Sequence, residues 1–273
     1  ERKVAFVTGA SRGIGRACAI SLAQAGYDVA VSARTLTDGS ARLDDGVTPV
    51  PGGLDTTVEK IIEAGQEGLA IEMDLMDRES VLNAADIAYD HFGRIDVLLN
   101  NAIYQGPGAM LTVKQLDDNH VKRLFEGNVF AQLALTRHLL PRFIDQGGAT
   151  VINMISATAF TNPPGKIGSG GWGVGYAMTK AAFERFAPLL MIEHGEDGIV
   201  TYNIDPGHVV TERQKAKRKD KEYTAFPSAP PEAIGKAIAW LVQDPSAAEE
   251  YGGKIVNAQR ETKRRNLLPG WPE

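Results

Sequence analysis

The chain has 273 residues, enough to bury the core of one large domain or two small ones. Its 43% hydrophobic and 23% charged residues are ordinary for a soluble protein, and its net charge of −5 gives no reason to expect nucleic-acid binding. No apolar run is long enough to span a bilayer, and we expect no cleavable leader. The single cysteine, Cys18, excludes an internal disulfide and a cysteine zinc site. We therefore expect a cytoplasmic protein that binds neither membrane nor nucleic acid.

Hydrophobic segments alternate in type along the chain. The pattern predicts, in order, strand 3–8, helix 14–25, strand 27–33, helix 54–65, strand 69–73, helix 77–92, strand 95–100, helix 115–145, strand 150–156, helix 175–194, strand 199–205, helix 231–243 and strand 254–258. Apolar strands that alternate with helices are typical of a parallel sheet covered on both faces. The sequence therefore predicts the α/β class, as a single doubly wound domain over residues 1–273.

Three segments interrupt this pattern. Residues 35–53 are rich in Gly, Pro and Asp and predict an irregular insertion. Residues 208–230 form a basic, proline-containing stretch that we interpret as a lid over a substrate site. Residues 259–273 predict a C-terminal tail that folds back on a neighbouring subunit.

A glycine-rich turn follows the first strand. In TGASRGIG, residues 8–15, the glycines Gly9, Gly13 and Gly15 lie between a strand and an amphipathic helix. Glycines let the backbone approach a pyrophosphate, and free N–H groups at the helix start can bind it. The alternative is a tight turn without a ligand. A second string at 168–173 spells G-x-G-x-x-G, but strand 150–156 ends a dozen residues earlier, so it predicts a flexible loop beside the substrate.

Several further motifs accompany this turn in a particular order. They are Asn-Asn-Ala at 100–102, Asn128, Ser156, Tyr176-x-x-x-Lys180 and Pro206-Gly207. With TGASRGIG they resemble the short-chain dehydrogenase/reductase family over essentially the whole chain, which implies a Rossmann-like fold. Two features depart from the family pattern. Ile103 stands where the family has glycine, and Ser156 precedes Tyr176 by twenty residues rather than by about a dozen.

The resemblance implies four catalytic residues: Asn128, Ser156, Tyr176 and Lys180. Tyr176 would pass a proton to or from the substrate oxygen, and its helical neighbour Lys180 would also hold the nicotinamide ribose. We expect the lysine cation and the positive nicotinamide ring to lower the pKa of Tyr176 from about 10. Ser156 would donate to the substrate oxygen, and Asn128 would hold a water in a proton relay. The alternatives are a surface Tyr–Lys pair, a turn-forming serine and a buried amide without chemistry.

The resemblance also implies a set of cofactor contacts: Gly9, Ser11, Arg12, Gly13, Ile14, Gly15, Arg34, Asp74, Leu75, Asn101, Ala102, Tyr176, Lys180, Pro206, Gly207, Val209 and Thr211. Among them, Asp74 would meet the adenine amino group and Thr211 the nicotinamide carboxamide. No carboxylate follows the second strand, where NAD-specific proteins bind the ribose. Arg34 and Arg12 could instead bind the 2′-phosphate of NADP, so the sequence favours NADP over NAD. The alternative is that both arginines are solvated.

The sequence thus predicts an NADP-dependent oxidoreductase that transfers a hydride between nicotinamide and a small-molecule carbonyl or secondary alcohol. A non-redox enzyme, such as a dehydratase or epimerase, and a catalytically silent NADP-binding protein are the alternatives. The basic run 213–221 is either a solvated lid helix or a patch that attracts an anionic thioester substrate. The five histidines lack ligand spacing, so we expect no catalytic metal. The resemblance also implies a homodimer or homotetramer.

Overall fold

A seven-stranded parallel sheet forms the centre of the computed structural model, which describes residues 2–43, 45–167, 169–217 and 228–272. The strands are β1 Val4–Thr8, β2 Asp28–Ala33, β3 Gly68–Glu72, β4 Val97–Asn100, β5 Ala149–Met154, β6 Ile199–Asp205 and β7 Ile255–Asn257. Their order is β3-β2-β1-β4-β5-β6-β7, so the winding reverses between β1 and β4. This order confirms the predicted doubly wound α/β class.

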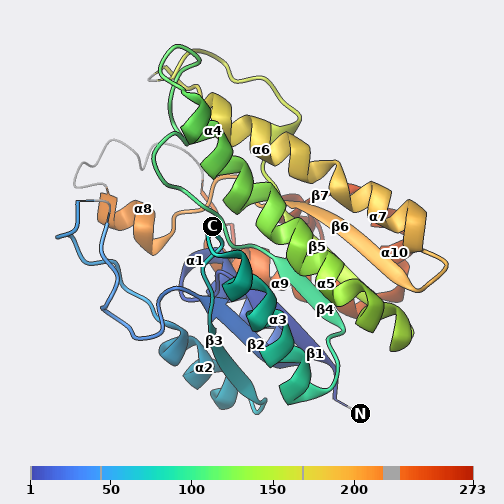
Figure 1. The fold of residues 1–273 in the computed structure, drawn as a ribbon. Coiled ribbons are helices and arrows are strands. Elements are labelled where there is room, and N and C mark those ends of the chain that lie inside the picture. The colour runs from blue at the N-terminus through green and yellow to red at the C-terminus, as the bar shows by residue number, and fades with distance from the viewer. Residues whose placement is uncertain (1, 44, 168, 218–227, 273) are drawn as a thin grey trace.

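Helices cover both faces of this sheet (Figure 1). They are α1 Gly13–Gln24, α2 Leu54–Glu63, α3 Arg78–Phe92, α4 Asp118–Phe125, α5 Ala131–Asp145, α6 Val174–Glu184, α7 Phe186–His194, α8 Glu212–Lys217, α9 Pro231–Gln243, α10 Pro245–Tyr251 and α11 Ala258–Arg264. One core lies between the sheet and α1, α2 and α9, and a second lies between the sheet and α3, α5 and α7. Because helices cover both faces, the inner strands consist mainly of buried apolar residues, whereas β3 at the edge is partly exposed.

Two predicted helices are divided in the structure. The predicted helix 115–145 begins only after Asp117, whose carboxylate accepts a hydrogen bond from the N–H of His120. It also contains a π-helical turn, Glu126–Phe130, between α4 and α5. The predicted helix 175–194 is split into α6 and α7 around Arg185. Hydrophobic spacing identified both helices but does not show such a local change in hydrogen bonding.

The insertion 35–53 packs on the glycine turn that follows β1. Its described residues contain an antiparallel bridge between Arg42 and Pro49 and no helix or longer strand. Gly52 has φ +106°, and a Cβ at this position would lie 2.5 Å from the carbonyl oxygen of Ser11. Only glycine allows this approach, which brings the insertion against the glycine turn.

The first residues of the C-terminal tail 259–273 form part of α11, which packs against α9 of the same chain. A contact of this tail with a neighbouring subunit stays a prediction. Thr262 is fully buried and donates its hydroxyl to the carbonyl oxygen of Ala233 in α9. Leu268 and Trp271 pack against the same core. The tail is therefore held by its own chain's apolar surface.

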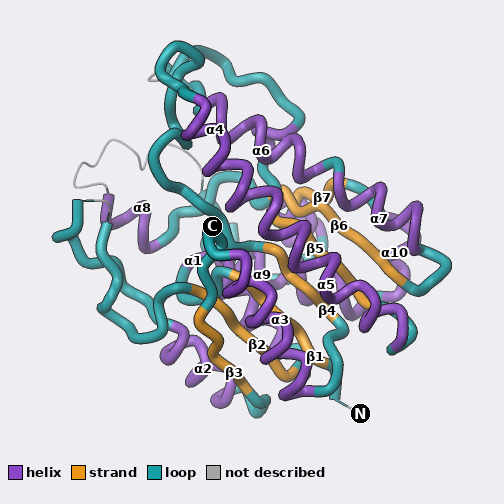
Figure 2. Tube along the Cα trace, in the orientation of Figure 1, coloured by secondary structure: helices purple, strands orange, loops and turns teal. Residues whose placement is uncertain are grey.

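Long loops gather beyond one end of the sheet. Figure 2 shows them around α4 and α8, and they follow the carboxyl ends of β2, β4, β5 and β6. Ligands of doubly wound folds bind at this end. Residues 218–227 of the predicted lid, and Gly168 of the second glycine string, lie outside the described residues. In the described part of the chain, no helix is both long and apolar enough to cross a membrane.

Candidate active site

The glycine turn lies directly against the end of β4. A Cβ on Gly15 would collide with the carbonyl oxygen of Gly9 and lie 2.5 Å from Nδ2 of Asn101. That amide nitrogen donates to the carbonyl oxygen of Thr8 at 2.8 Å. The contact places Asn101, from the Asn-Asn-Ala motif, beside the glycine turn.

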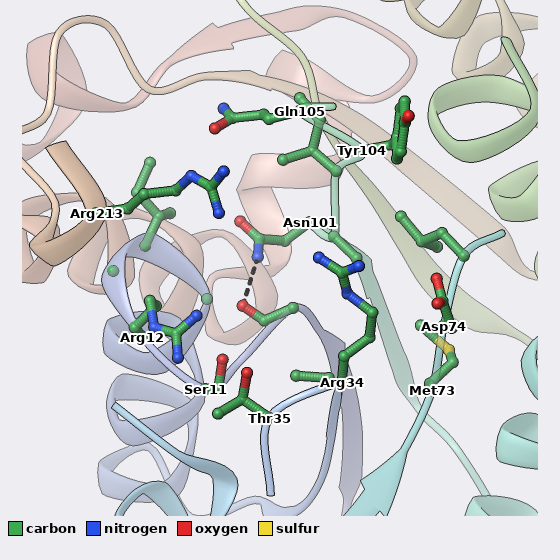
Figure 3. Close-up of a pocket in the computed structure, with 18 of the residues that line it drawn as sticks. Ser11, Arg12, Arg34, Thr35, Met73, Asp74, Asn101, Tyr104, Gln105 and Arg213 are labelled. Atoms are coloured by element: carbon green, nitrogen blue, oxygen red, sulfur yellow. Dashed lines mark hydrogen bonds between the residues drawn. The ribbon is translucent and has the colours of Figure 1, made fainter. Parts of the chain in front are cut away.

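A pocket of about 460 Å³ opens over this turn (Figure 3). Of the predicted cofactor contacts, it is lined by Gly9, Ser11, Arg12, Gly13, Ile14, Gly15, Arg34, Asp74, Leu75, Asn101, Ala102 and Thr211. It is also lined by residues that the sequence did not single out as contacts: Ala33, Thr35, Met73, Ile103, Tyr104, Gln105, Gly106, Pro107 and Arg213. Tyr176, Lys180, Pro206, Gly207 and Val209 do not line it. The structure therefore brings together most of the predicted contacts, from four different strand ends and from Thr211 just before α8.

Three arginines surround the pocket. Arg12 donates Nε to the carbonyl oxygen of Pro51 at 2.9 Å and Nη2 to that of Gly52 at 2.7 Å, so it also anchors the insertion 35–53. Arg34 enters from the end of β2 and Arg213 from α8, with both guanidinium groups directed into the pocket (Figure 3). The pocket therefore presents a cluster of cations to an anionic ligand.

Tyr176 and Lys180 lie one turn apart in α6. Lys180 is only 3% exposed and donates its ammonium to the carbonyl oxygen of Met154, at the end of β5, at 2.6 Å. Burial lowers the pKa of this ammonium to about 8, because water no longer stabilises the charged form. The helix thus holds a cation in the protein interior beside a phenol.

Ser156 lies close enough to Tyr176 to act on its phenol, although it precedes Tyr176 by twenty residues. Burial raises the pKa of Tyr176, the nearby Ser156 hydroxyl opposes the rise, and the charge of Asp205 adds to it. The prediction of a lowered pKa includes the positive ring of a bound cofactor and so stays a prediction; the raised pKa is that of the polypeptide alone. Desolvation of the phenol outweighs its neighbours.

Asn128 lies in the π-helical turn between α4 and α5 and is fully buried. Its Oδ1 accepts from the N–H of Tyr104 at 2.7 Å, and its Nδ2 donates to the carbonyl oxygen of Tyr104 at 3.2 Å. Nδ2 also lies 3.4 Å from the Thr179 hydroxyl in α6. Turns of this kind often occur at functional sites. Asn128 therefore ties the segment at the pocket wall to the helix that carries Tyr176.

Asp205 joins two segments at the end of β6. Its Oδ1 accepts hydrogen bonds from the N–H of Ala157, next to Ser156, and from that of Gly207, both at 3.1 Å. Asn257 donates to Oδ2 at 3.3 Å. The Pro206–Gly207 turn and the Ser156 segment are thus fastened to one buried carboxylate.

The sequence over residues 3–222 matches the short chain dehydrogenase family. The chain belongs to this family. It is 31% identical over 229 residues to an NADPH-dependent aldehyde reductase 1 of Arabidopsis thaliana, covering 84% of this chain and 73% of that protein. It is 27% identical to an L-rhamnose 1-dehydrogenase (NAD(P)(+)) of a Sphingomonas species, over 95% of this chain and 98% of that protein.

A solved structure shares the fold of this short-chain dehydrogenase. It is a putative short-chain alcohol dehydrogenase from Sinorhizobium meliloti, with a TM-score of 0.77 and 23% identity over 94% of each chain. The sequence resemblance to the family is thereby confirmed, and with it an NAD(P)-dependent oxidoreductase.

The residues at or near the site that were not predicted to belong to it include Tyr104, Asp205, Glu212 and Arg213. Tyr104 and Asp205 lie next to recognised motifs, after Asn-Asn-Ala and before Pro206-Gly207. Their proximity in sequence was a usable signal. Arg213 appeared only as part of a basic run, which does not indicate where a side chain points. In the described part of the chain, no cluster of His, Cys, Asp or Glu side chains could hold a metal ion.

Proposed function

We propose that this chain is an NADP-dependent reductase or dehydrogenase that transfers a hydride between nicotinamide and a carbonyl or secondary alcohol, with Tyr176 as general acid and base. The observation that supports it best is the buried ammonium of Lys180, which donates to the carbonyl oxygen of Met154 one helical turn from Tyr176. The lysine of a surface Tyr–Lys pair would be solvated, whereas Lys180 is buried. A dehydratase or epimerase, and a catalytically silent NADP-binding protein, would have the same fold, so only a turnover assay separates them from a dehydrogenase.

Each side chain of the site has its own role in the proposed reaction. The bound cofactor supplies or accepts the hydride. In reduction, Tyr176 donates its proton to the substrate oxygen while Ser156 donates a hydrogen bond to the same atom. The raised pKa of Tyr176 keeps the phenol protonated near neutral pH, which suits this direction. Lys180 would bind the nicotinamide ribose, and Asn128 would hold α6 and the Tyr104 segment in register.

The test is to offer the protein a panel of ketones, aldehydes and secondary alcohols. The absorbance of reduced nicotinamide reports turnover of each compound. We expect Tyr176→Phe to lower kcat by about 100-fold or more, because a positioned proton donor contributes at least that much. The dissociation constant of NADPH should stay within a factor of two. Retained turnover would remove Tyr176 as the proton donor. Product formation without an absorbance change would favour a dehydratase or epimerase. Cofactor binding without any turnover would favour a catalytically silent NADP-binding protein.

The preference for NADP rests on the cations at the adenosine end of the pocket. β2 ends in Ser32 and Ala33 without a carboxylate, and Arg34 points into the pocket (Figure 3). The NADPH-dependent relative is consistent with this assignment. Fluorescence titration should show that NADPH binds about tenfold or more tightly than NADH, since a charge-assisted hydrogen bond contributes roughly 1.5–3 kcal/mol. Arg34→Gln should remove most of this difference and leave NADH affinity unchanged. Equal affinities in the wild type would contradict the assignment.

We also propose self-association into a homodimer or homotetramer. Large apolar side chains are exposed on the π-helical turn and on α6 and α7: Phe130, Met178, Leu189 and Ile192. Ile192 is 77% exposed. Apolar surface of this kind is typical of protein interfaces. Light scattering should give a mass of two or four chains, and Ile192→Glu should reduce it. A monomeric wild type at micromolar concentration would contradict the proposal.

A further inference from the structure

Helix α8 is attached to the phosphate loop by one carboxylate. Oε2 of Glu212, the first residue of α8, accepts a hydrogen bond from the backbone N–H of Gly13 at 2.9 Å. The preceding Thr211 packs at the same place, since a Cβ on Gly13 would lie 3.1 Å from its Cγ2. Two segments about 200 residues apart thus meet at the first turn of α1.

The first turn of α1 has no acidic residue of its own. Arg12 occupies the N-cap position and makes no side-chain cap hydrogen bond, and the first turn contains no Asp or Glu. The N–H groups of a helix start carry a partial positive charge and lack partners within the helix. Glu212 therefore supplies the anion that a capping residue would normally provide.

The same N–H groups belong to the proposed pyrophosphate site. Gly13 and Thr211 both line the pocket, together with Arg213, the residue after Glu212. Glu212 and Asp38 are the anions that act on Arg12, and Arg213 and Arg34 are the cations that act on it. A carboxylate and a pyrophosphate cannot both occupy this position, because each would need the Gly13 N–H and they would repel each other.

We propose that Glu212 is an internal competitor of the cofactor: its carboxylate holds α8 on Gly13 until the pyrophosphate replaces it, and Arg213 then serves as a phosphate ligand. This inference rests on the proposed function. It assigns opposite effects to two adjacent residues of α8. Arg213 reaches the pocket from the side opposite Arg34, so the two cations would flank a bound pyrophosphate (Figure 3). The position of α8 thereby depends on whether cofactor is bound.

The substitution Glu212→Gln separates the charge from the hydrogen bond. The amide oxygen of glutamine can still accept from Gly13, but it carries no charge to oppose a phosphate. We expect the dissociation constant of NADPH to fall about three- to tenfold, the effect of a charge at a partly buried helix start. We expect Arg213→Gln to raise it by a similar factor. Glu232→Gln, an exposed acid in the first turn of α9, is the matched control and should leave it unchanged.

The measurement is titration of intrinsic protein fluorescence with NADPH, repeated at several salt concentrations. The gain in affinity of Glu212→Gln should shrink as salt screens the charges. If the wild type binds NADPH and Glu212→Gln binds it equally or more weakly, this inference is overturned and the proposed function is not affected. If neither the wild type nor Glu212→Gln binds NADPH or NADH, the proposed function fails and this inference fails with it.

Discussion

At the scale of single residues, the site is built from charged and polar groups that the fold removes from water. Lys180 is an interior cation, and Asp205 is a buried anion that accepts two backbone hydrogen bonds. Burial raises the pKa of Tyr176 because it disfavours the phenolate, and it lowers the pKa of Lys180 because it disfavours the ammonium. These two shifts follow from where each side chain lies rather than from its type.

Asp205→Asn tests this view of Tyr176. The substitution removes a negative charge that acts on the phenol and keeps an oxygen that can accept from Ala157 or Gly207. Alcohol oxidation needs the deprotonated phenol, so the midpoint of its pH–rate profile should move to lower pH. Measurement of kcat/KM against pH gives this midpoint directly. An unchanged midpoint would contradict a role for the Asp205 charge, and the exposed Glu193→Gln on α7 serves as the control.

At the scale of elements, close helix contacts place the start of α1 at the pocket. Gly235 in α9 lies against α1, and a Cβ there would be 2.5 Å from the Ser21 hydroxyl and 2.6 Å from the carbonyl oxygen of Ala17. Glycine permits the two helix backbones to approach each other. The cofactor end of α1 is therefore positioned by a contact far along the chain from the glycine turn.

Replacing Gly235 with valine should separate α1 from α9. Overpacking of this kind typically costs about 1–3 kcal/mol in the free energy of unfolding. Urea unfolding would measure the loss. Glu232→Ala, on the exposed side of the same helix, should change stability by less than about 0.5 kcal/mol. A Gly235→Val protein as stable as the wild type would show that the helices can move apart without loss.

The second glycine string belongs to another element, the loop before α6. Gly173, at the N-cap position of α6, packs so closely on the carbonyl oxygen of Ala109 that a side chain would collide with it. None of the described residues of 165–173 lines the cofactor pocket. This arrangement fits the hypothesis that the segment borders the substrate rather than the phosphates.

Trp172→Ala tests the substrate role of this loop. We expect the relative kcat/KM values across the carbonyl panel to change by about threefold or more, the effect of altering apolar contacts in a pocket. The dissociation constant of NADPH should not change, because the loop lies outside the cofactor pocket. The opposite result, weaker NADPH binding with the same substrate range, would assign the loop to the cofactor.

At the scale of the whole molecule, the C-terminal segment is part of the folded core. Glu261 in α11 is 1% exposed and accepts a hydrogen bond from Nε of Arg264 at 2.9 Å. Burial raises the pKa of Glu261, but hydrogen bonds with Tyr251 and Arg264 outweigh it, so its pKa is lowered overall. The charged carboxylate is therefore linked to folding.

This linkage predicts how stability depends on pH. Because the pKa of Glu261 is lower in the folded than in the unfolded chain, its contribution is present above the ordinary value of 4.5 and is lost as pH falls through the folded value. Glu261→Gln should lower the free energy of unfolding at pH 7 by about 1–3 kcal/mol. The free energy of unfolding of this variant should also decrease less as the pH falls than that of the wild type. The exposed Glu249→Gln is the control and should lose stability on acidification as the wild type does. If Glu261→Gln loses as much free energy of unfolding on acidification as these two proteins, the linkage is contradicted.

The sequence by itself determined the fold class and most residues of the candidate site. Apolar periodicity depends on local geometry, and so strands, helices and their alternation could be predicted, as could the turn with Gly9, Gly13 and Gly15. The order of the motifs identified the family. The π-helical turn at Asn128 was not predictable, because a single extra residue in a helical turn leaves the hydrophobic spacing almost unchanged.

Only the tertiary structure decided the contacts between distant segments. The hydrogen bond from Gly13 to Glu212, the charge of Asp205 near Tyr176 and the packing of α11 on α9 join residues that no local pattern relates. The direction of the Tyr176 pKa shift belongs here too, since burial is a property of the assembled chain. Hydrogen bonds and charges act through space, so their partners are set by which surfaces meet once the sheet has formed.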